Sequence, residues 1–361
     1  MEAPAVHYAT TSDGMRIAYG VIGAGDPLVY MPWATSYFAE EWRMFLDEKN
    51  PAFGNSPLSM IPRSARSFAS RFRVVQYDAR GQGLSSRGLP ESHCIKDYVL
   101  DLEAIIGELG LRDFVLYSGV LSGHVAIHYA IAHPELVRAL VLDSGGINRA
   151  MQNAHLFSDA LETSWDAFLQ MHASMFEGGA AEARLTWLRS ATTHADYIKT
   201  LKASNESNVE SVLAAVSTPS LVVAAPTFPA TVDAAQRLAA GIPGAQLHLF
   251  GGHLNEHLDA AGSDPSPALV ILSNFLKNLS GQAPESLGAS HSKDDRARTL
   301  SRREIEVLCL IATGQSNAQI AEALVISPNT VGHHVSNIFD KLALANRAEA
   351  TAYALRNGFV A

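Results

Sequence analysis

The chain has 361 residues and a formal net charge of −9 at pH 7, and 47% of its residues are hydrophobic while 17% are charged. This composition supplies large apolar cores and excludes a disordered or collagen-like chain, and the length predicts two or three domains. Two cysteines cannot build a disulfide framework, and we find neither an export signal nor a run of 18 apolar residues. We therefore expect a cytoplasmic protein that has no membrane-spanning segment.

The charge is unevenly distributed along the chain. Residues from Lys293 onward carry eight Lys or Arg and seven Asp or Glu, a net charge of +1, which leaves −10 on the preceding residues. Ahead of the near-neutral part, residues 281–299 (GQAPESLGASHSKDDRART) are polar and aperiodic. We expect a flexible linker there, with a mean span of about 25 Å, between a domain at 1–280 and another at 300–361.

In the first domain, expected strands and helices alternate. Short apolar runs predict strands, in chain order, at Met15–Val21, Leu28–Met31, Arg73–Tyr77, Phe114–Tyr117, Ala139–Asp143, Leu221–Ala224 and Gln246–Phe250. Helical patterns lie at Asp97–Leu109, Ser122–His133, Thr231–Ala240 and Ser266–Leu279. The later strands are almost wholly apolar, as in a parallel sheet covered by helices on both faces. Residues from about 147 to 216 are helical in pattern and too long for a simple connection, which predicts an inserted lid.

Four segments of this domain resemble the α/β-hydrolase fold. They are FRVVQYDARGQGLSSR at 72–87, DYVLDLEAIIGELGL at 97–111, FVLYSGVLSGHVAIHYAIAHPELVRALVL at 114–142 and IPGAQLHLFGGHLNEH at 242–257. The resemblance implies an α/β domain with a mostly parallel sheet and a helical lid. Hydrolysis on such a fold uses a nucleophile in a G-x-S-x-G turn, a histidine base and an acid that orients it.

The nucleophile is missing from the matching turn. Ungapped alignment puts Val120 at its position, and a valine side chain has no lone pair with which to attack. Neither Ser118 nor Ser122 has the flanking glycines of the motif. A shifted register therefore does not restore the turn.

The acid and the oxyanion donor of the family are also absent from their usual positions. No carboxylate follows the strand at Leu221–Ala224 before Asp233, inside the next helix, and Pro32-Trp33 replaces the usual His-Gly of the oxyanion loop. Pro32 has no backbone N–H to donate to an oxyanion. Of the family's catalytic groups, only the equivalent of the base, His253, therefore remains in the sequence. We expect no catalytic residues, no metal and no cofactor, and hence a non-enzyme.

We expect the cavity between sheet and lid to persist as a small-molecule site. Its expected lining is apolar and aromatic with one histidine: Trp33, Tyr37, Phe38, Val120, Leu121, Trp165, Phe168, Phe176 and His253. An alternative for Trp165, Phe168 and Phe176, at helical spacing, is that they form the lid's own core. His253 has the alternative of bonding a backbone carbonyl.

The remainder of the chain predicts a compact unit of four short helices. A capping box of Ser301 and Glu304 starts the first helix at Ser301–Thr313, and the second spans Asn317–Leu324. The third starts at Ser327 and Pro328 and runs to Leu342, and the fourth covers Arg347–Arg356. Two short helices, a tight turn and a longer third helix are typical of a DNA-binding helix-turn-helix, although three-helix units also serve as interaction modules.

Residues 300–355 (LSRREIEVLCLIATGQSNAQIAEALVISPNTVGHHVSNIFDKLALANRAEATAYAL) resemble the LuxR-type (GerE-type) DNA-binding domain. The resemblance implies that Asn329–Lys341 is the recognition helix and that helix four is the dimer contact. The residues that it assigns to DNA are Asn317, Asn329, Thr330, His333, Ser336, Asn337, Lys341 and Arg347. Gly332 stands where the family usually has Lys, so we expect weak DNA binding by a single copy and a homodimer on an inverted repeat.

Together these features predict a one-component transcriptional regulator, associated with the nucleoid when bound to DNA. A small apolar or amphipathic effector would bind the degenerate hydrolase domain and control the DNA-binding domain. One alternative is an active hydrolase with an unconventional site around His253. Another is a pseudoenzyme whose lid binds a protein.

Overall fold

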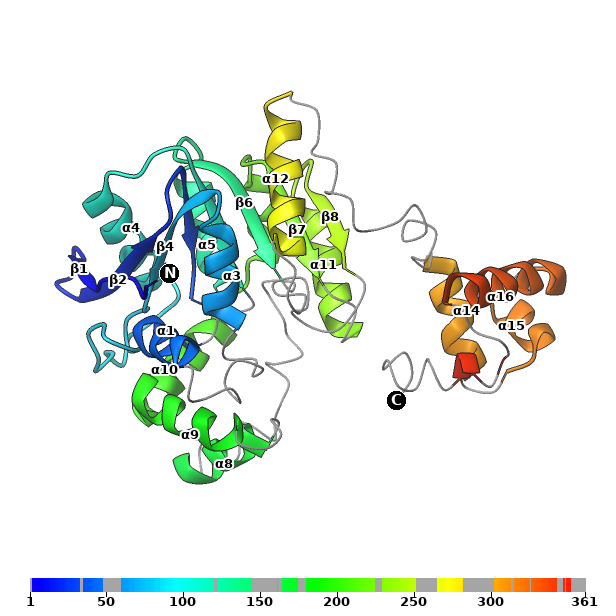
Figure 1. Cartoon of the computed structure of the whole chain (residues 1–361), viewed down its shortest axis with the longest axis horizontal. Helices are drawn as coiled ribbons and strands as arrows, with labels where there is room; N and C mark the ends of the chain where they lie inside the picture. The colour runs from blue at the N-terminus through cyan, green and yellow to red at the C-terminus, as the bar shows by residue number, and fades with distance from the viewer. Residues whose placement is uncertain are drawn as a thin grey trace. The chain divides into compact units, whose positions relative to one another are not determined.

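The structure is a computed structural model that describes residues 2–32, 35–47, 60–119, 122–143, 161, 164–174, 180–224, 229–250, 265–281, 302–312, 315–324, 326–342, 347 and 349–351. Within these ranges the chain forms two compact units, residues 2–281 and residues 302–351, which are described separately. Figure 1 labels most of their elements.

The first unit is built on one sheet of eight strands within the described residues. In chain order they are β1 (His7–Thr10), β2 (Arg16–Ile22), β3 (Asp26–Tyr30), β4 (Phe72–Tyr77), β5 (Phe114–Ser118), β6 (Val137–Asp143), β7 (Ser220–Ala224) and β8 (Gln246–Leu249). Their order across the sheet is β1-β2-β4-β3-β5-β6-β7-β8, and the pairs from β4 to β8 are parallel while β2 is antiparallel to β1 and β4. Every residue of β5 and β7 is buried, as expected for strands covered on both faces.

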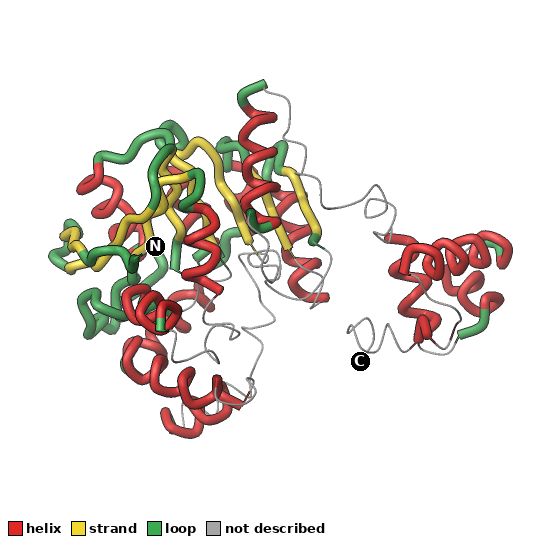
Figure 2. The backbone as a smooth tube through the Cα atoms, in the orientation of Figure 1, coloured by secondary structure: helices red, strands yellow, loops and turns green. Residues whose placement is uncertain are grey.

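Helices cover both faces of the sheet (Figures 1 and 2). One core cluster joins the sheet to α4 (Asp97–Leu109), α5 (Gly123–Ala132) and α11 (Pro229–Gly241). The opposite cluster joins it to α1 (Phe38–Leu46), α3 (Met60–Phe68) and α12 (Pro267–Leu279). This three-layer arrangement confirms the predicted fold class, an α/β-hydrolase-like sheet with a separate all-α unit.

The predicted lid segment contains helices that have their own core. They are α8 (Trp165–Ser174), α9 (Ala180–Ala191) and α10 (His194–Glu206). The 3-10 helix η2 (Glu210–Ala215), which follows them, packs instead in the core of the sheet through Leu213. The buried residues of this cluster are Met44, Leu161, Phe168, Leu169, Trp187, Leu188 and Ala191. Because Met44 belongs to α1, the lid core continues into the body of the unit.

A set of hydrogen bonds, which we call the loop–lid clasp, joins the loop at 81–89 to the α9–α10 junction at 190–199. The carboxylate of Asp196 is 1% exposed and accepts the backbone N–H of Leu89 at 2.7 Å and that of the preceding residue at 3.0 Å. The hydroxyl of Thr192 donates to a carbonyl of the loop at 3.0 Å. These bonds fix the second half of the lid to the sheet domain.

The second unit contains α14 (Arg302–Ala312), α15 (Asn317–Leu324) and α16 (Pro328–Leu342). Its core consists of small and branched apolar side chains: Val307, Leu308, Ile311, Ile320, Ala321, Val331, Ile338 and Ala350. Val331 and Ile338, seven residues apart on α16, are fully buried, which gives this helix one inward face and leaves the other exposed.

Candidate functional site

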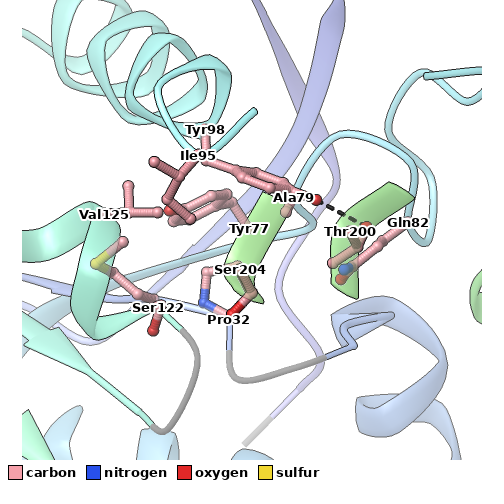
Figure 3. Close-up of a pocket in the computed structure, with 11 residues that line it drawn as sticks. Pro32, Tyr77, Ala79, Gln82, Ile95, Tyr98, Ser122, Val125, Thr200 and Ser204 are labelled. Carbon is pink, nitrogen blue, oxygen red and sulfur yellow. Dashed lines mark hydrogen bonds between the residues drawn. The ribbon is translucent and has the colours of Figure 1, made fainter. Parts of the chain in front are cut away.

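A small cavity opens at the carboxyl edge of the sheet in the first unit (Figure 3). It has a volume of about 50 Å³ and is lined by Met31, Pro32, Tyr77, Ala79, Gln82, Ile95, Tyr98, Ser122, Val125, Thr200 and Ser204. These residues come from the ends of β3 and β4, the start of α5, and from α4 and α10. The topology therefore gathers them where ligands bind in parallel α/β sheets, beyond the carboxyl ends of the strands.

Several polar groups in the cavity wall are bonded to the protein. The hydroxyls of Tyr98 and Thr200 lie 2.8 Å apart and link α4 to α10, as the dashed line in Figure 3 shows. Gln82 accepts hydrogen bonds at its Oε1 from the backbone N–H and the hydroxyl of Ser36, at 2.8 and 3.0 Å. Burial raises the pKa of Tyr98, so its phenol stays protonated at neutral pH.

Ser204 differs from these groups. Its side chain is 4% exposed and lines the cavity, and its Oγ has no hydrogen-bond partner within the described part of the chain. A buried hydroxyl usually has a partner, because an unsatisfied one costs free energy. The cavity wall thus combines apolar surface with a buried hydroxyl that has no partner in the described residues.

Two buried carboxylates lie at the same edge of the sheet. Asp78 follows β4, accepts the backbone N–H groups of Phe38 and Leu84 at 2.9 Å each, and has its pKa raised to about 6 by burial. Asp143 ends β6, is fully buried and accepts the hydroxyl of Tyr117 at 2.6 Å. Asp78 holds the start of α1 and the loop after β4 in place. Asp143 lies on β6, the strand beside β5 in the sheet.

His124 stands near the start of α5 and is 3% exposed. Burial, followed by the nearby charge of His128, lowers the pKa of His124 to about 4. Its imidazole is therefore neutral at physiological pH.

Five of the predicted ligand contacts lie outside the described residues. They are Trp33, Val120, Leu121, Phe176 and His253. Their assignment to the ligand stays a prediction.

The four described members of that predicted set lie away from the cavity lining. Phe38 packs into the core, where its Cε2 would lie 2.9 Å from a Cβ built on Gly20 of β2. Trp165 and Phe168 stack at 5.4 Å and pack in the lid cluster, as the alternative reading of these aromatic residues expects, and Tyr37 packs against the same cluster. These four side chains pack in hydrophobic clusters and do not line this cavity, and their assignment to a ligand stays a prediction.

The sequence reasoning missed the polar residues of the cavity wall. Thr200 and Ser204 are four residues apart on α10, which puts both on one helix face. This four-residue spacing of hydroxyl side chains was the signal in the sequence that could have indicated a polar face on α10. The pairing of Thr200 with Tyr98, about a hundred positions earlier, has no local signature.

No group of three or more His, Cys, Asp or Glu gathers in metal-binding geometry within the described residues. In the same part of the chain, no helix has the length and apolar character needed to cross a membrane.

In the second unit, a serine caps the longest helix. The hydroxyl of Ser327 accepts the backbone N–H of Thr330 at 3.0 Å and lies 2.8 Å from the Thr330 hydroxyl, as expected for the cap of α16. His333, Ser336 and Asn337 are exposed on this helix. Two helices, a short turn and a third helix with an exposed polar face form the helix-turn-helix geometry.

Two protein families match the sequence. Residues 298–354 match the family described as bacterial regulatory proteins of the LuxR family, and residues 50–181 match the α/β-hydrolase fold. The chain joins an α/β-hydrolase domain to a LuxR-family helix-turn-helix domain.

Curated relatives match the LuxR-family part of the chain. The transcriptional regulatory protein LiaR of Bacillus subtilis is 47% identical over 62 residues, which are 17% of this chain and 29% of LiaR. The oxygen regulatory protein NreC of Staphylococcus carnosus is 38% identical over 93 residues, 26% of this chain and 40% of NreC. The chain thus spans well under half the length of these relatives.

Solved structures match the α/β-hydrolase domain. A hydrolase from Pseudomonas aeruginosa has a TM-score of 0.56 and 22% identity, covering 75% of this chain and 98% of that protein. An esterase from Exiguobacterium antarcticum has a TM-score of 0.58 and 16% identity, covering 77% and 100%. At this identity, the likeness establishes the fold.

Several residues assigned to DNA have protein partners in the LuxR-family domain. The Lys341 ammonium lies 2.8 Å from the buried carboxylate of Glu304 on α14. Arg347 donates to the Oδ1 of Asn317 at 3.0 Å and to a backbone carbonyl just before α15. Lys341, Arg347 and Asn317 therefore connect helices within the domain, in addition to any DNA contact. Asn329 starts α16, but its side chain lies outside the described set.

Gly332 occupies an open position on α16. A Cβ built on it meets nothing within 4 Å, so no packing in the described part of the domain explains a glycine there. The family's usual Lys would fit at this position.

Proposed function

We propose that the chain is a one-component transcriptional regulator, in which the α/β-hydrolase domain binds a small effector and the LuxR-family domain binds DNA. The observation that carries this proposal is the presence in one chain of a LuxR-family domain and a mostly apolar cavity at the ligand-binding edge of a hydrolase fold. A regulator of this kind acts in the cytoplasm, on the nucleoid.

The expectation from the sequence that the hydrolase domain has no catalytic residues supports a receptor role. The sequence has Val120 where the fold places its nucleophile. Pro32, which lines the cavity in the oxyanion segment, cannot donate a backbone N–H. A site that lacks an attacking atom and an oxyanion donor binds its guest without transforming it.

The effector must bind two states of the protein with different affinities, because equal binding shifts no equilibrium. The loop–lid clasp holds the α9–α10 junction on the sheet domain. We therefore expect α8, which these bonds do not hold, to differ in position between the two states.

The DNA-binding side requires two copies. The part of the chain from Lys293 onward has a net charge of only +1, and phosphate contacts by cations supply most non-specific affinity for DNA. Two LuxR-family domains on an inverted repeat would combine two weak contacts into useful affinity. We expect the full chain to bind such a site as a homodimer.

A DNA selection tests this proposal. The full-length chain is used to enrich sequences from a random duplex library, and its affinity for the enriched duplex is measured by fluorescence anisotropy with and without fractionated cell metabolites. We expect an inverted repeat to be enriched and at least one fraction to change the affinity. Absence of duplex enrichment, or an affinity that no fraction alters, would contradict the regulator or the sensor part respectively.

The second candidate function is hydrolysis at an unconventional site, and Asp143 favours it. This buried carboxylate ends the strand beside β5 and could serve as the acid that the sequence lacks after β7. Hydrolysis of p-nitrophenyl butyrate that disappears in both His253→Ala and Asp143→Asn, while Asp233→Asn retains it, would establish this function. We expect no turnover above the uncatalysed rate in any of these proteins.

A further inference from the structure

We propose that the cavity selects small neutral oxygen-bearing molecules, or the oxygen-bearing end of a larger one, through the hydroxyl of Ser204. This inference rests on the proposed sensor role of the α/β-hydrolase domain and specifies the chemistry of its ligand.

The first support is the state of the Ser204 hydroxyl. Serines inside helices commonly bond back to the carbonyl four residues earlier, and Ser273 in α12 does so, donating to Leu269 at 2.7 Å. Ser204 in α10 is equally buried, but its Oγ makes no such bond to any described atom. Turned toward the cavity, the Ser204 O–H would donate to a ligand oxygen placed there and so be satisfied.

The second support is the absence of charge from the described cavity wall. Its lining side chains are apolar, hydroxyl or amide groups, and none is Lys, Arg, Asp or Glu. An ion transferred into such a wall would lose its hydration without gaining a counter-charge. The ligand is therefore uncharged where it occupies this cavity.

The third support is the size of the cavity and the position of Ser204 in it. A volume of about 50 Å³ holds about three to five water-sized groups, since each needs about 10–15 Å³. Met31, Tyr77, Ile95 and Val125 supply the apolar surface, and Ser204 lines the cavity from the lid helix α10. This arrangement suits a short alkyl group that carries one ketone, ester, amide or hydroxyl oxygen.

A pair of isosteric probes tests the inference. Butan-2-one and 2-methylbut-1-ene have the same shape, and they differ in a carbonyl oxygen against a methylene group. Binding of each to the full-length chain is followed by chemical-shift titration of ¹³C-labelled methionine and isoleucine methyl groups, because Met31 and Ile95 line the cavity. The variants are Ser204→Ala and, as a matched control, Ser207→Ala.

Ser207 is a suitable control because its Oγ is also buried without a described partner and lies three residues away, outside the cavity lining. We expect the wild type to prefer the ketone by about 5- to 10-fold, the value of one hydrogen bond to a buried group. Ser204→Ala should lose this preference, and Ser207→Ala should keep it. Both variants should unfold at or above the wild-type temperature, since each removes an unsatisfied hydroxyl.

Each other outcome overturns the inference. If both probes bind equally, or if the ketone preference survives in Ser204→Ala, then the hydroxyl does not select the ligand, while the sensor role still stands. If neither probe binds the wild type, the cavity is not a site for such molecules. The sensor role is tested by separate experiments. Ester turnover by the protein, or an affinity for DNA that no metabolite fraction alters, would contradict it.

Discussion

Substitutions at Gly332 test directly what limits the stability of the LuxR-family domain and its affinity for DNA. It lies within α16, and a Cβ added there meets nothing within 4 Å. Replacing an unstrained helical glycine by alanine gains about 0.8–1 kcal/mol of helix propensity. We therefore expect Gly332→Ala to stabilise the domain by about this amount, which for a unit of this size raises its unfolding midpoint by about 4–8 °C.

Gly332→Lys adds a cation to the same position. It should gain most of the same helix stability and create one new phosphate contact per copy bound to DNA. Each phosphate contact makes the slope of log affinity against log salt steeper by about 0.9. Tighter binding at low salt and a steeper salt dependence are thus expected of the lysine variant, whereas the alanine variant should keep the wild-type slope.

Calorimetry of the full chain measures the first effect, and anisotropy with the selected duplex at several NaCl concentrations measures the second. All four tryptophans lie before residue 190, so tryptophan fluorescence reports the α/β-hydrolase domain and should not change in either variant. Weaker DNA binding by Gly332→Ala, despite a more stable helix, would refute the reasoning. It would mean that the glycine allows a close approach of the α16 backbone to DNA.

Three further predictions concern buried charges and a strained turn. Lys341→Met should lower the midpoint of the LuxR-family domain by removing the ammonium beside the buried Glu304 carboxylate, a loss of about 1–3 kcal/mol; Lys341→Arg should retain most of the stability, and an unchanged methionine variant would contradict an ion-pair role. His124 has a pKa of about 4 in the folded state, so its protonation in the unfolded chain costs about 3 kcal/mol of stability as pH falls from 6.5 to 4. In urea titrations, the free energy of unfolding of His124→Gln should therefore rise relative to that of the wild type as pH falls from 6.5 to 4. A difference between the two proteins that does not depend on pH would contradict this. The raised pKa of Asp78 increases the free energy of unfolding as pH falls, which opposes the effect of His124. This contribution is the same in the wild type and the variant, so it cancels in the difference between them. Gly83→Ala should destabilise by 2 kcal/mol or more, on the order expected for a strained clash, because Gly83 has a φ of +49° and its new Cβ would lie 2.1 Å from Asp78 Oδ2; a variant with unchanged urea midpoint would refute it.

Elements with local end signals were predictable. The helix at Asp97–Leu109 was predicted with both ends correct, since Gly110 follows it with a φ of +59° and ends it in the left-handed conformation. The same holds for α15 and α16, whose starts are set by serine caps such as Ser327. Seven of the strands were predicted to within one or two residues at each end. For strands such as β7 the signal was different, a continuous apolar run that is buried along its whole length.

Elements that depend on distant contacts were missed. The start of α1 is held by the bond from the Phe38 N–H to Asp78, forty residues later, and no sequence pattern announces it. The strand at His7–Thr10 has a single buried residue, too little for a pattern. The candidate site followed the same rule: the fold family located the edge of the sheet, but the wall contributed by Thr200 and Ser204 depends on how α10 packs.

The loop–lid clasp bears on any attempt to exchange ligand specificity among relatives of this fold. Because Asp196 of the lid is bonded to the backbone near Leu89, the lid and the 81–89 loop have to be inherited together in a chimera. A crossover between them would leave a buried carboxylate facing a foreign main chain. Recombination points placed before residue 81 and after α10 would keep both partners, and so would suit the construction of biosensors with new inputs.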